Sequence, residues 1–288
     1  MFTFLPLVAF LTAAKNQTHT ISLTTQTFNK QVSGKDDTFF ILFYTDDTPQ
    51  LTELKEQMEK LAKNMKTIGI KVATVHLNEN QELAQTYQIT QVPHMLFFRP
   101  NKEPMKYATD WNAKSIEKWI LENMLGTDKV TVLKKEEAVT KYFGETSKYP
   151  RVLVFSKKKT PPPMFKQLCY KHRKGINCGF VSGGFNTLPE IGEHISKYGD
   201  FSVEDVDYPT VVIIDEAHDP KLVTLSDRLT YETLNATVAP HSLTTKKALA
   251  KKEQKKIENL NSTNPYKRLR RENRAPRKSS FEDDDDEL

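Results

Sequence analysis

The sequence predicts an α/β protein in which two similar domains are followed by a charged tail. A wholly apolar run, Phe39–Tyr44, leads through the polar turn 45–48 to Pro49, where a helical pattern begins. Such a run is typical of a central strand covered on both faces, and proline is favourable in the first turn of a helix. The same arrangement recurs at Arg151–Phe155 and Pro161–Pro163, and 288 residues suffice for two cores of ordinary size.

Strand and helix signals alternate through the first predicted domain, residues 18–125. Apolar residues at three- and four-residue steps, among them Leu51, Leu54 and Met58, predict an amphipathic helix over Pro49–Met65. Pro93 stands shortly before an apolar strand. The other strands are expected at Ile21–Leu23, Val72–Leu77, Met95–Phe98 and Tyr107–Ala108, and the other helices at Thr27–Val32, Asn80–Tyr87 and Ser115–Leu125.

The second predicted domain, residues 127–240, repeats this order after Gly126. Pro209 precedes an apolar strand at Val211–Ile214, as Pro93 precedes one in the first domain. The other strands are expected at Val130–Leu133, Arg151–Phe155, Asn177–Val181 and Leu222–Leu225, and the helices at Glu136–Phe143, Pro161–His172, Leu188–Tyr198 and Tyr231–Val238.

The N-terminal residues predict a secretory signal peptide at 1–14. An apolar run, Phe4–Leu11, is followed by the small residues Thr12–Ala14, which suit cleavage. The alternative is a buried N-terminal helix, since the run is too short to span a bilayer, and no other stretch approaches transmembrane length. Three Asn-x-Ser/Thr sequons are compatible with a secretory route and are candidate N-glycosylation sites. They begin at Asn16, Asn235 and Asn261.

Charge is distributed unevenly along the chain. The net charge is +5, yet residues 246–278 hold 13 Lys or Arg against three Glu, and residues 282–287 are all acidic. Residues 1–245 are therefore nearly neutral and predict no nucleic-acid partner. Blocks of like charge with few apolar residues predict a disordered tail at 241–288, basic and then acidic, with a transient helix over Lys246–Leu260.

Several segments of the first domain resemble the thioredoxin domain of the protein disulfide isomerase family. They are FILFY before the long helix, KVATVHLNENQELAQTYQITQVPHMLFF, and WNAKSIE before the last helix. The resemblance implies a mixed central sheet flanked by helices, with a cis Val92–Pro93 bond facing the strand-to-helix turn. The segment Tyr208–Thr210 resembles the same proline segment, so the chain is expected to hold two tandem thioredoxin-like domains.

In that family the strand-to-helix turn carries Cys-x-x-Cys, whose thiolate is stabilised at the helix N-terminus. The equivalent positions here are Thr48 and Leu51. The resemblance also places Leu42 where the family has a buried acid and Thr74 where it has that acid's lysine partner. Loss of the thiols leaves a buried carboxylate without a use, and burying one is costly. We therefore expect a redox-inactive domain with no cofactor.

Acidic, histidine and lysine side chains at or near these turns have both a functional and a structural interpretation. Asp46 and Asp47 could act as ligands or as an acid–base pair, but carboxylates at a helix N-terminus also cap it and interact with its dipole. The seven histidines are scattered, so no metal site is expected, and His94 is the one nearest the turn. In the second domain, Lys157–Lys159 occupy the corresponding turn and supply no redox nucleophile.

The two cysteines, Cys169 and Cys178, lie on a predicted helix and the following strand. In an oxidising compartment such a pair suggests a structural disulfide. Both segments also contribute to the core, where cysteine behaves as a small hydrophobe. A thiol-disulfide isomerase acting through these cysteines, or with a thiol-active partner protein, is an alternative function.

The expected function is non-covalent binding of unfolded or partly folded secretory polypeptides in the endoplasmic reticulum lumen. Asp285, Asp286, Glu287 and Leu288 resemble a retrieval signal that is read by a receptor. The alternative for the basic tail is binding of nucleic acid or anionic lipid. The residues expected to bind peptide, as an added strand beside each proline segment, are Tyr44, Pro49, Val92, Pro93, His94, Met95, Tyr208, Pro209 and Thr210.

Overall fold

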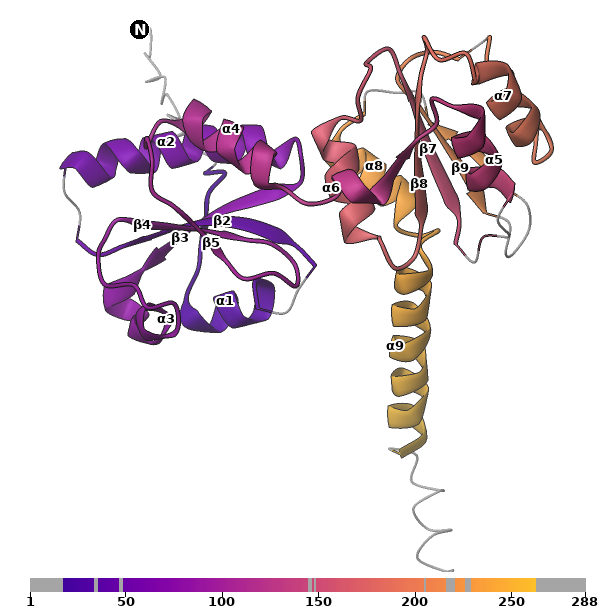
Figure 1. Cartoon of the computed structure of the whole chain (residues 1–288). Helices are drawn as coiled ribbons and strands as arrows, with labels where there is room; N and C mark the ends of the chain where they lie inside the picture. The colour runs from indigo at the N-terminus through magenta and orange to yellow at the C-terminus, as the bar shows by residue number, and fades with distance from the viewer. Residues whose placement is uncertain are drawn as a thin grey trace, which may run out of the picture.

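The computed structural model describes residues 18–33, 36–46, 49–144, 147, 149–204, 206–215, 221–225 and 229–262 (Figure 1). It contains two α/β domains in sequence, each built on a five-stranded mixed sheet. The fold class predicted from the sequence is therefore confirmed. The predicted leader at 1–14, Asn16 and the four C-terminal residues lie outside the described residues. No described helix is both long enough and apolar enough to cross a membrane.

Domain 1 has the strand order β1-β3-β2-β4-β5. The strands β1, β3 and β2 run parallel, whereas β4 and β5 are antiparallel to their neighbours. Helices α1 and α3 cover one face of the sheet and α2 and α4 the other (Figure 1). The bounds are β1 Ile21–Ser22, α1 Thr25–Gln31, β2 Thr38–Tyr44, α2 Pro49–Lys66, β3 Ile70–His76, a 3-10 turn at Leu77–Glu79, α3 Gln81–Thr86, β4 His94–Phe98, β5 Met105–Tyr107 and α4 Ala113–Asn123.

The central strand β2 divides the core of domain 1 into two halves. Phe40 and Leu42 pack with α2 and α4, whereas Phe39, Ile41 and Phe43 pack with α1 and α3. All five side chains are fully buried. Successive residues of a strand point to opposite faces, so only a wholly apolar run can serve a sheet that is covered on both sides.

Domain 2 repeats the arrangement with the strand order β10-β9-β7-β8-β6. Here α6 and α8 cover one face, and α5 and α7 cover the other. A 3-10 turn at Thr127–Lys129 connects the domains. The bounds are β6 Val130–Val132, α5 Glu136–Gly144, β7 Arg151–Ser156, α6 Pro163–Lys171, β8 Asn177–Ser182, α7 Leu188–Ser196, β9 Thr210–Asp215, β10 Lys221–Leu225 and α8 Tyr231–Val238.

Helix α6 of domain 2 lies against domain 1. The buried side chain of Gln167 donates a hydrogen bond from Nε2 to Thr38 Oγ1 at 2.8 Å. The hydroxyl of Tyr170, one turn further, donates to the carbonyl of Pro100 at 3.0 Å. Both bonds join residues that are far apart in sequence, so they fix how the two domains sit together.

Ion pairs extend this contact between the domains. Asp37 accepts from Lys71 of its own domain at 2.7 Å and from Lys171 of domain 2 at 3.0 Å. Arg173 adds a second bridge, to Asp36, at 2.9 Å. Burial by itself would raise the pKa of the Asp37 carboxyl, but the hydrogen bonds and positive charges of the two lysines outweigh it, and the pKa is lowered.

The prediction of a disordered tail over 241–288 is wrong for residues 243–262, whereas residues 263–288 lie outside the described residues. Residues Leu243–Ser262 form a continuous helix, α9, that begins before the transient helix expected from Lys246. This stretch contains neither Gly nor Pro and is rich in Ala, Leu, Lys, Gln and Glu, which are good helix formers. Its first turn is held to domain 2, because Lys246 Nζ lies 2.8 Å from the buried carboxylate of Asp215. The rest of α9 projects away from the domain (Figure 1).

Candidate functional site

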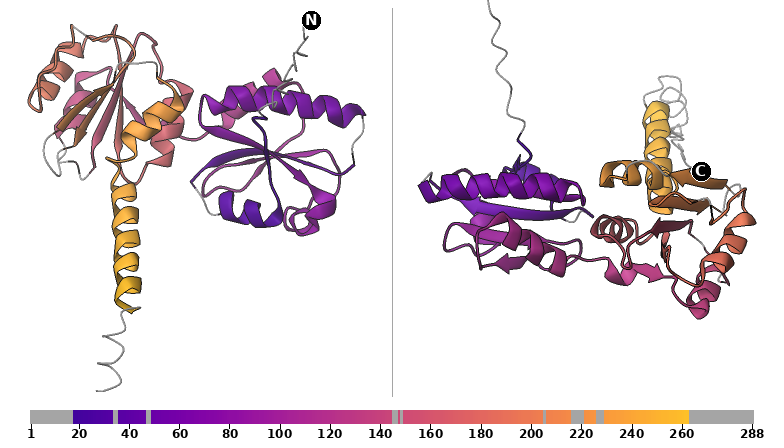
Figure 2. Two further views of the ribbon diagram at one scale, coloured as in Figure 1. Left: turned by 180° about the vertical axis from the view of Figure 1, so that it is seen from behind. Right: turned by 90° about the horizontal axis from the view of Figure 1, so that it is seen from above.

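The topology of domain 1 gathers three segments at one end of its sheet. The register pairs Phe43 at the end of β2 with His94 at the start of β4, and Met95 with Tyr107 at the end of β5. The end of β2, the residues before β4 and the loop 108–112 after β5 therefore meet, beside the start of α2. We call this region the open edge. It lies on the side of domain 1 that faces away from domain 2 (Figures 1 and 2).

A cis peptide bond lies at the open edge between Val92 and Pro93, and a second one lies at Tyr208–Pro209 in domain 2. The two bonds occupy corresponding places, each directly before the antiparallel central strand. Val92 is 39% exposed and is one of three large hydrophobic residues in the described part of the chain that are exposed. The proline segment thus presents an apolar side chain to solvent.

Aromatic and basic side chains from neighbouring elements pack beside Tyr44. The ring of His76, on β3, lies 5.1 Å from the ring of half-buried Tyr44, and Lys55 Nζ lies 4.2 Å from the centre of the tyrosine ring. Burial, together with the charge of Lys106, lowers the pKa of His94. The shift favours the neutral imidazole, which can donate one hydrogen bond and accept another.

Trp111 is a part of the open edge that the sequence interpretation missed. It is 43% exposed, more than any other large hydrophobic residue in the described part of the chain. Its loop is held in place, because the Tyr107 hydroxyl donates to the Asp110 carbonyl and the Ala113 amide donates to Gln57 Oε1 of α2 at 3.2 Å. The available signal was a tryptophan between Asp110 and Asn112, in a segment with no apolar neighbours to pack it.

Two of the expected peptide-binding residues are not accessible. Met95 is 2% exposed and packs in the core beneath α2 and α4, and Thr210 is equally buried at the start of β9. The strand alternation explains both positions, because each lies inside a central strand that is paired on both sides. Their side chains cannot contact a peptide, whereas Tyr44, Pro49, Val92, Pro93, His94, Tyr208 and Pro209 are all at least partly exposed.

The two positions equivalent to redox cysteines differ in what the structure describes. Thr48 and Asp47 lie outside the described residues. Leu51, on α2, is buried in the core of domain 1. Leu42 and Thr74 are direct partners in the β2–β3 register, so the two positions expected for the acid and its lysine are adjacent.

Asp46, a candidate ligand or acid–base group, accepts a hydrogen bond from the Asn78 amide at 3.1 Å. Within the described residues, no three His, Cys, Asp or Glu side chains are grouped as metal ligands.

In domain 2, Lys157–Lys159 are exposed at the end of β7, and the backbone amide of Lys158 donates to Ser156 Oγ at 3.2 Å. Asn235 lies on α8 with its Oδ1 3.0 Å from Nε2 of the buried His172. The side chain expected to carry a glycan is therefore half-buried, and its amide oxygen contacts His172. Asn261 lies near the end of α9.

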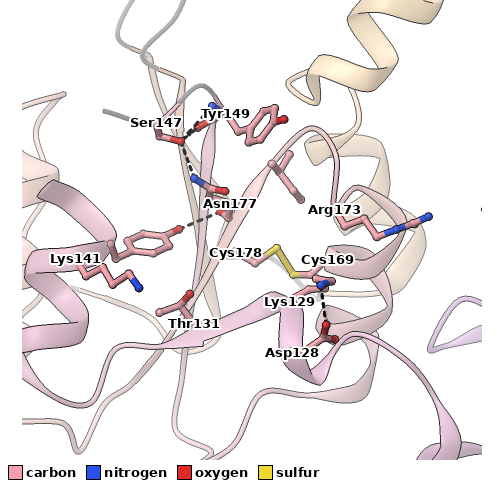
Figure 3. A pocket seen from close by; sticks show the side chains of 12 residues that line it. Asp128, Lys129, Thr131, Lys141, Ser147, Tyr149, Cys169, Arg173, Asn177 and Cys178 are labelled. Carbon is pink, nitrogen blue, oxygen red and sulfur yellow. Dashed lines mark hydrogen bonds and ion pairs between the residues drawn. A yellow bond between two sulfur atoms is a disulfide. The ribbon is translucent and has the colours of Figure 1, made fainter. Parts of the chain in front are cut away.

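Cys169 and Cys178 form a disulfide that joins α6 to β8. Both residues also belong to the core of domain 2. The pair is therefore both a disulfide and part of the hydrophobic core. The disulfide lines a cleft of about 530 Å³ (Figure 3). Across the cleft, Tyr142 donates to the carbonyl of Asn177 at 3.0 Å, and the Asn177 amide donates to Ser147 Oγ at 2.6 Å.

Domain 1 matches a known protein family. The thioredoxin family model matches residues 19–122. A protein-disulfide-isomerase-like protein of Dictyostelium discoideum is 23% identical over 233 residues, which cover 79% of this chain and 53% of that protein. The chain thus spans about half the length of this relative.

The solved structures to which this chain is similar include ERdj5 and ERp44. Full-length ERdj5 is 17% identical, with 76% of this chain and 32% of that chain covered and a TM-score of 0.40. Zinc-bound human ERp44 is 14% identical, with 78% and 61% covered and a TM-score of 0.35. A single thioredoxin-type domain of ERdj5, Trx4, is 20% identical, with 37% and 96% covered and a TM-score of 0.34.

Proposed function

We propose that this chain binds unfolded or partly folded polypeptides without forming covalent bonds. Its domain 1 matches the thioredoxin family, and the chain is similar to a protein-disulfide-isomerase-like protein. The observation that carries the proposal is the exposure of Val92 and Trp111 at the open edge. Apolar side chains exposed together in one region mark interaction sites more often than isolated ones do.

The proposed contact combines backbone and side-chain recognition. The proline segment lies at the open edge directly before β4, and an extended polypeptide beside it would add strand-like hydrogen bonds. Val92 and Trp111 contact apolar side chains of that polypeptide, while Tyr44 and Pro49 extend the surface. Backbone pairing does not depend on side chains, so we expect the site to accept many sequences, each with low affinity.

Non-covalent binding is favoured because domain 1 supplies no thiol. The chain has two cysteines, and both are joined in the disulfide of domain 2. A thiolate is the nucleophile of thiol–disulfide exchange, and Leu51 cannot replace it. We place this activity in the lumen of the endoplasmic reticulum, on the strength of the apolar N-terminal run and the C-terminal Asp285–Leu288, with retrieval by a receptor for that signal.

The binding proposal is tested with a fluorescent, permanently unfolded secretory polypeptide and the double variant Val92→Ser, Trp111→Ala. We expect affinity to fall about tenfold, because truncating an aromatic anchor typically costs about 1–2 kcal/mol. Val132→Ser is the matched control, since Val132 is 38% exposed but lies on an edge strand of domain 2. Equal loss in the control, or no loss in the double variant, contradicts the assignment of the open edge.

The competing function, thiol exchange through the cleft of domain 2, is tested separately by reduction of insulin. We expect no turnover above the rate with the reductant alone. Turnover that disappears in the Cys169→Ser, Cys178→Ser variant would show instead that this chain is a thiol enzyme.

A further inference from the structure

A cavity of about 350 Å³ lies next to Trp111, between the first three turns of α2 and the loop before α4. Trp111 borders it on one side, and α2 forms the opposite wall. The side chain of Leu54, buried in the core of domain 1, provides an apolar base. The residues that line the cavity are Gln50, Glu53, Leu54, Gln57, Asp110, Trp111 and Asn112.

The charged groups of the cavity are all negative. Glu53 and Asp110 are both exposed, and no Lys or Arg is among the residues that line it. Neither carboxylate forms an ion pair with any residue that the structure describes. The Asp110 carboxylate accepts one hydrogen bond, from Ser115 Oγ at 3.0 Å, which leaves further acceptor capacity.

The wall that carries Trp111 is held in place by its neighbours. Asp110 is fixed by the Tyr107 hydroxyl, and Asn112 caps α4 by accepting from the Lys114 amide at 2.9 Å. Gln57 of α2 accepts from the Ala113 amide and ties the loop to the opposite wall. A cavity formed in advance loses less conformational freedom when a ligand enters.

We propose that this cavity receives the side chain of an arginine, or less favourably a lysine, of the bound polypeptide. The inference rests on the proposed function, because the cavity adjoins the open edge. An arginine stem packs on Leu54 while its planar guanidinium stacks on the Trp111 ring and donates hydrogen bonds to Glu53 and Asp110. Lysine carries the same charge but lacks the planar fork that pairs with two carboxylates and stacks on an aromatic ring.

The dipole of α2 disfavours a cation near the first turn of this helix, but the dipole is weaker than the negative charges of the cavity. The N-terminus of a helix is equivalent to about half a positive charge, and the effect fades within one turn. Glu53 and Asp110 contribute two full negative charges, and the cavity extends along α2 as far as Gln57. The net local charge therefore favours a cationic side chain.

The test uses the full chain and two extended fluorescent peptides that share an apolar core and differ at one position, arginine or its uncharged isostere citrulline. At low salt we expect the arginine peptide to bind about tenfold more tightly, with the ratio falling toward one as salt is raised. In the Glu53→Gln, Asp110→Asn variant we expect this preference to disappear. Circular dichroism establishes that the variant is folded.

Two surface glutamates on α5 provide the matched control, because Glu136 and Glu137 are exposed and lie in domain 2. The Glu136→Gln, Glu137→Gln variant removes the same charge and should keep the preference for arginine. If the wild-type chain binds both peptides equally, or the preference persists in Glu53→Gln, Asp110→Asn, the inference is wrong while the proposed function stands. Absence of binding by either peptide overturns the proposed function and this inference with it.

Discussion

At the residue scale, the carboxylate of Glu59 connects the first described residues to α2. Glu59 on α2 accepts hydrogen bonds from the backbone amides of His19 and Thr20 and from the Thr20 hydroxyl, the last at 2.8 Å. Nδ1 of His19 lies within 2.8 Å of the same carboxylate. Partial burial would raise the pKa of Glu59, but these hydrogen bonds outweigh burial and lower the pKa to about 2.

We predict that Glu59→Gln lowers the free energy of unfolding by about 1 kcal/mol at pH 7, a modest value because the carboxylate is partly exposed. The folded pKa is depressed, so the stabilisation is present above pH 4.5 and is lost as pH falls from 4.5 toward 2. Urea unfolding of both proteins across this range measures the difference. A gap that stays constant with pH would contradict the assigned role of the ionised carboxylate.

At the scale of elements, α6 connects the core of domain 2 to domain 1. The disulfide ties it to β8, and the contact between His172 and Asn235 joins its C-terminal end to α8. The same helix carries Gln167 and Tyr170, which form hydrogen bonds with domain 1. Whatever loosens α6 within domain 2 is therefore expected to weaken the contact between the domains as well.

The Cys169→Ser, Cys178→Ser variant is predicted to lose about 3 kcal/mol of stability in domain 2, because the disulfide restricts the conformations of the unfolded chain. Urea unfolding monitored by circular dichroism gives the difference. As a control, reduction of the wild-type chain with a small dithiol, which reaches the disulfide through the cleft, should lower its stability to that of the variant. An unchanged unfolding midpoint would show that the bond adds no stability.

At the scale of the whole molecule, charged and polar side chains of the described residues bridge the two domains. Asp37 joins Lys71 of domain 1 to Lys171 of domain 2, with Asp36 and Arg173 beside them. Removing the Asp37 carboxylate leaves the charges of Lys71 and Lys171 close together without the anion that joins them. The relative position of the domains therefore depends on a few side chains.

We predict that Asp37→Asn weakens domain association by about 1–2 kcal/mol and increases the radius of gyration in small-angle X-ray scattering. Glu79→Gln is the control, because Glu79 pairs with His76 inside domain 1 at 3.7 Å. Since the pKa of Asp37 is depressed, acidification through its folded pKa should reproduce the effect of the substitution in the wild-type chain. Identical scattering of the two variants would refute the role of Asp37.

Local patterns in the sequence were sufficient for most elements of both domains. The apolar run of β2, the amphipathic spacing of α2 and the repeated proline before a central strand depend on near neighbours, and the structure has each where expected. The tail was the exception. Its charge pattern indicated disorder with a transient helix over Lys246–Leu260, but strong helix propensity and the contact between Lys246 and Asp215 give a continuous helix over Leu243–Ser262.

Tertiary structure alone decided which residues could form a site. Met95 and Val92 are three residues apart and both apolar, yet one is buried beneath α2 and the other is exposed. The cysteine pairing, the meeting of Trp111 with Glu53 and the bridge from Asp37 to Lys171 join segments distant in sequence or separated by a turn. Secondary structure follows from residues within a few positions of one another, whereas burial and charge environment depend on whatever the fold brings alongside.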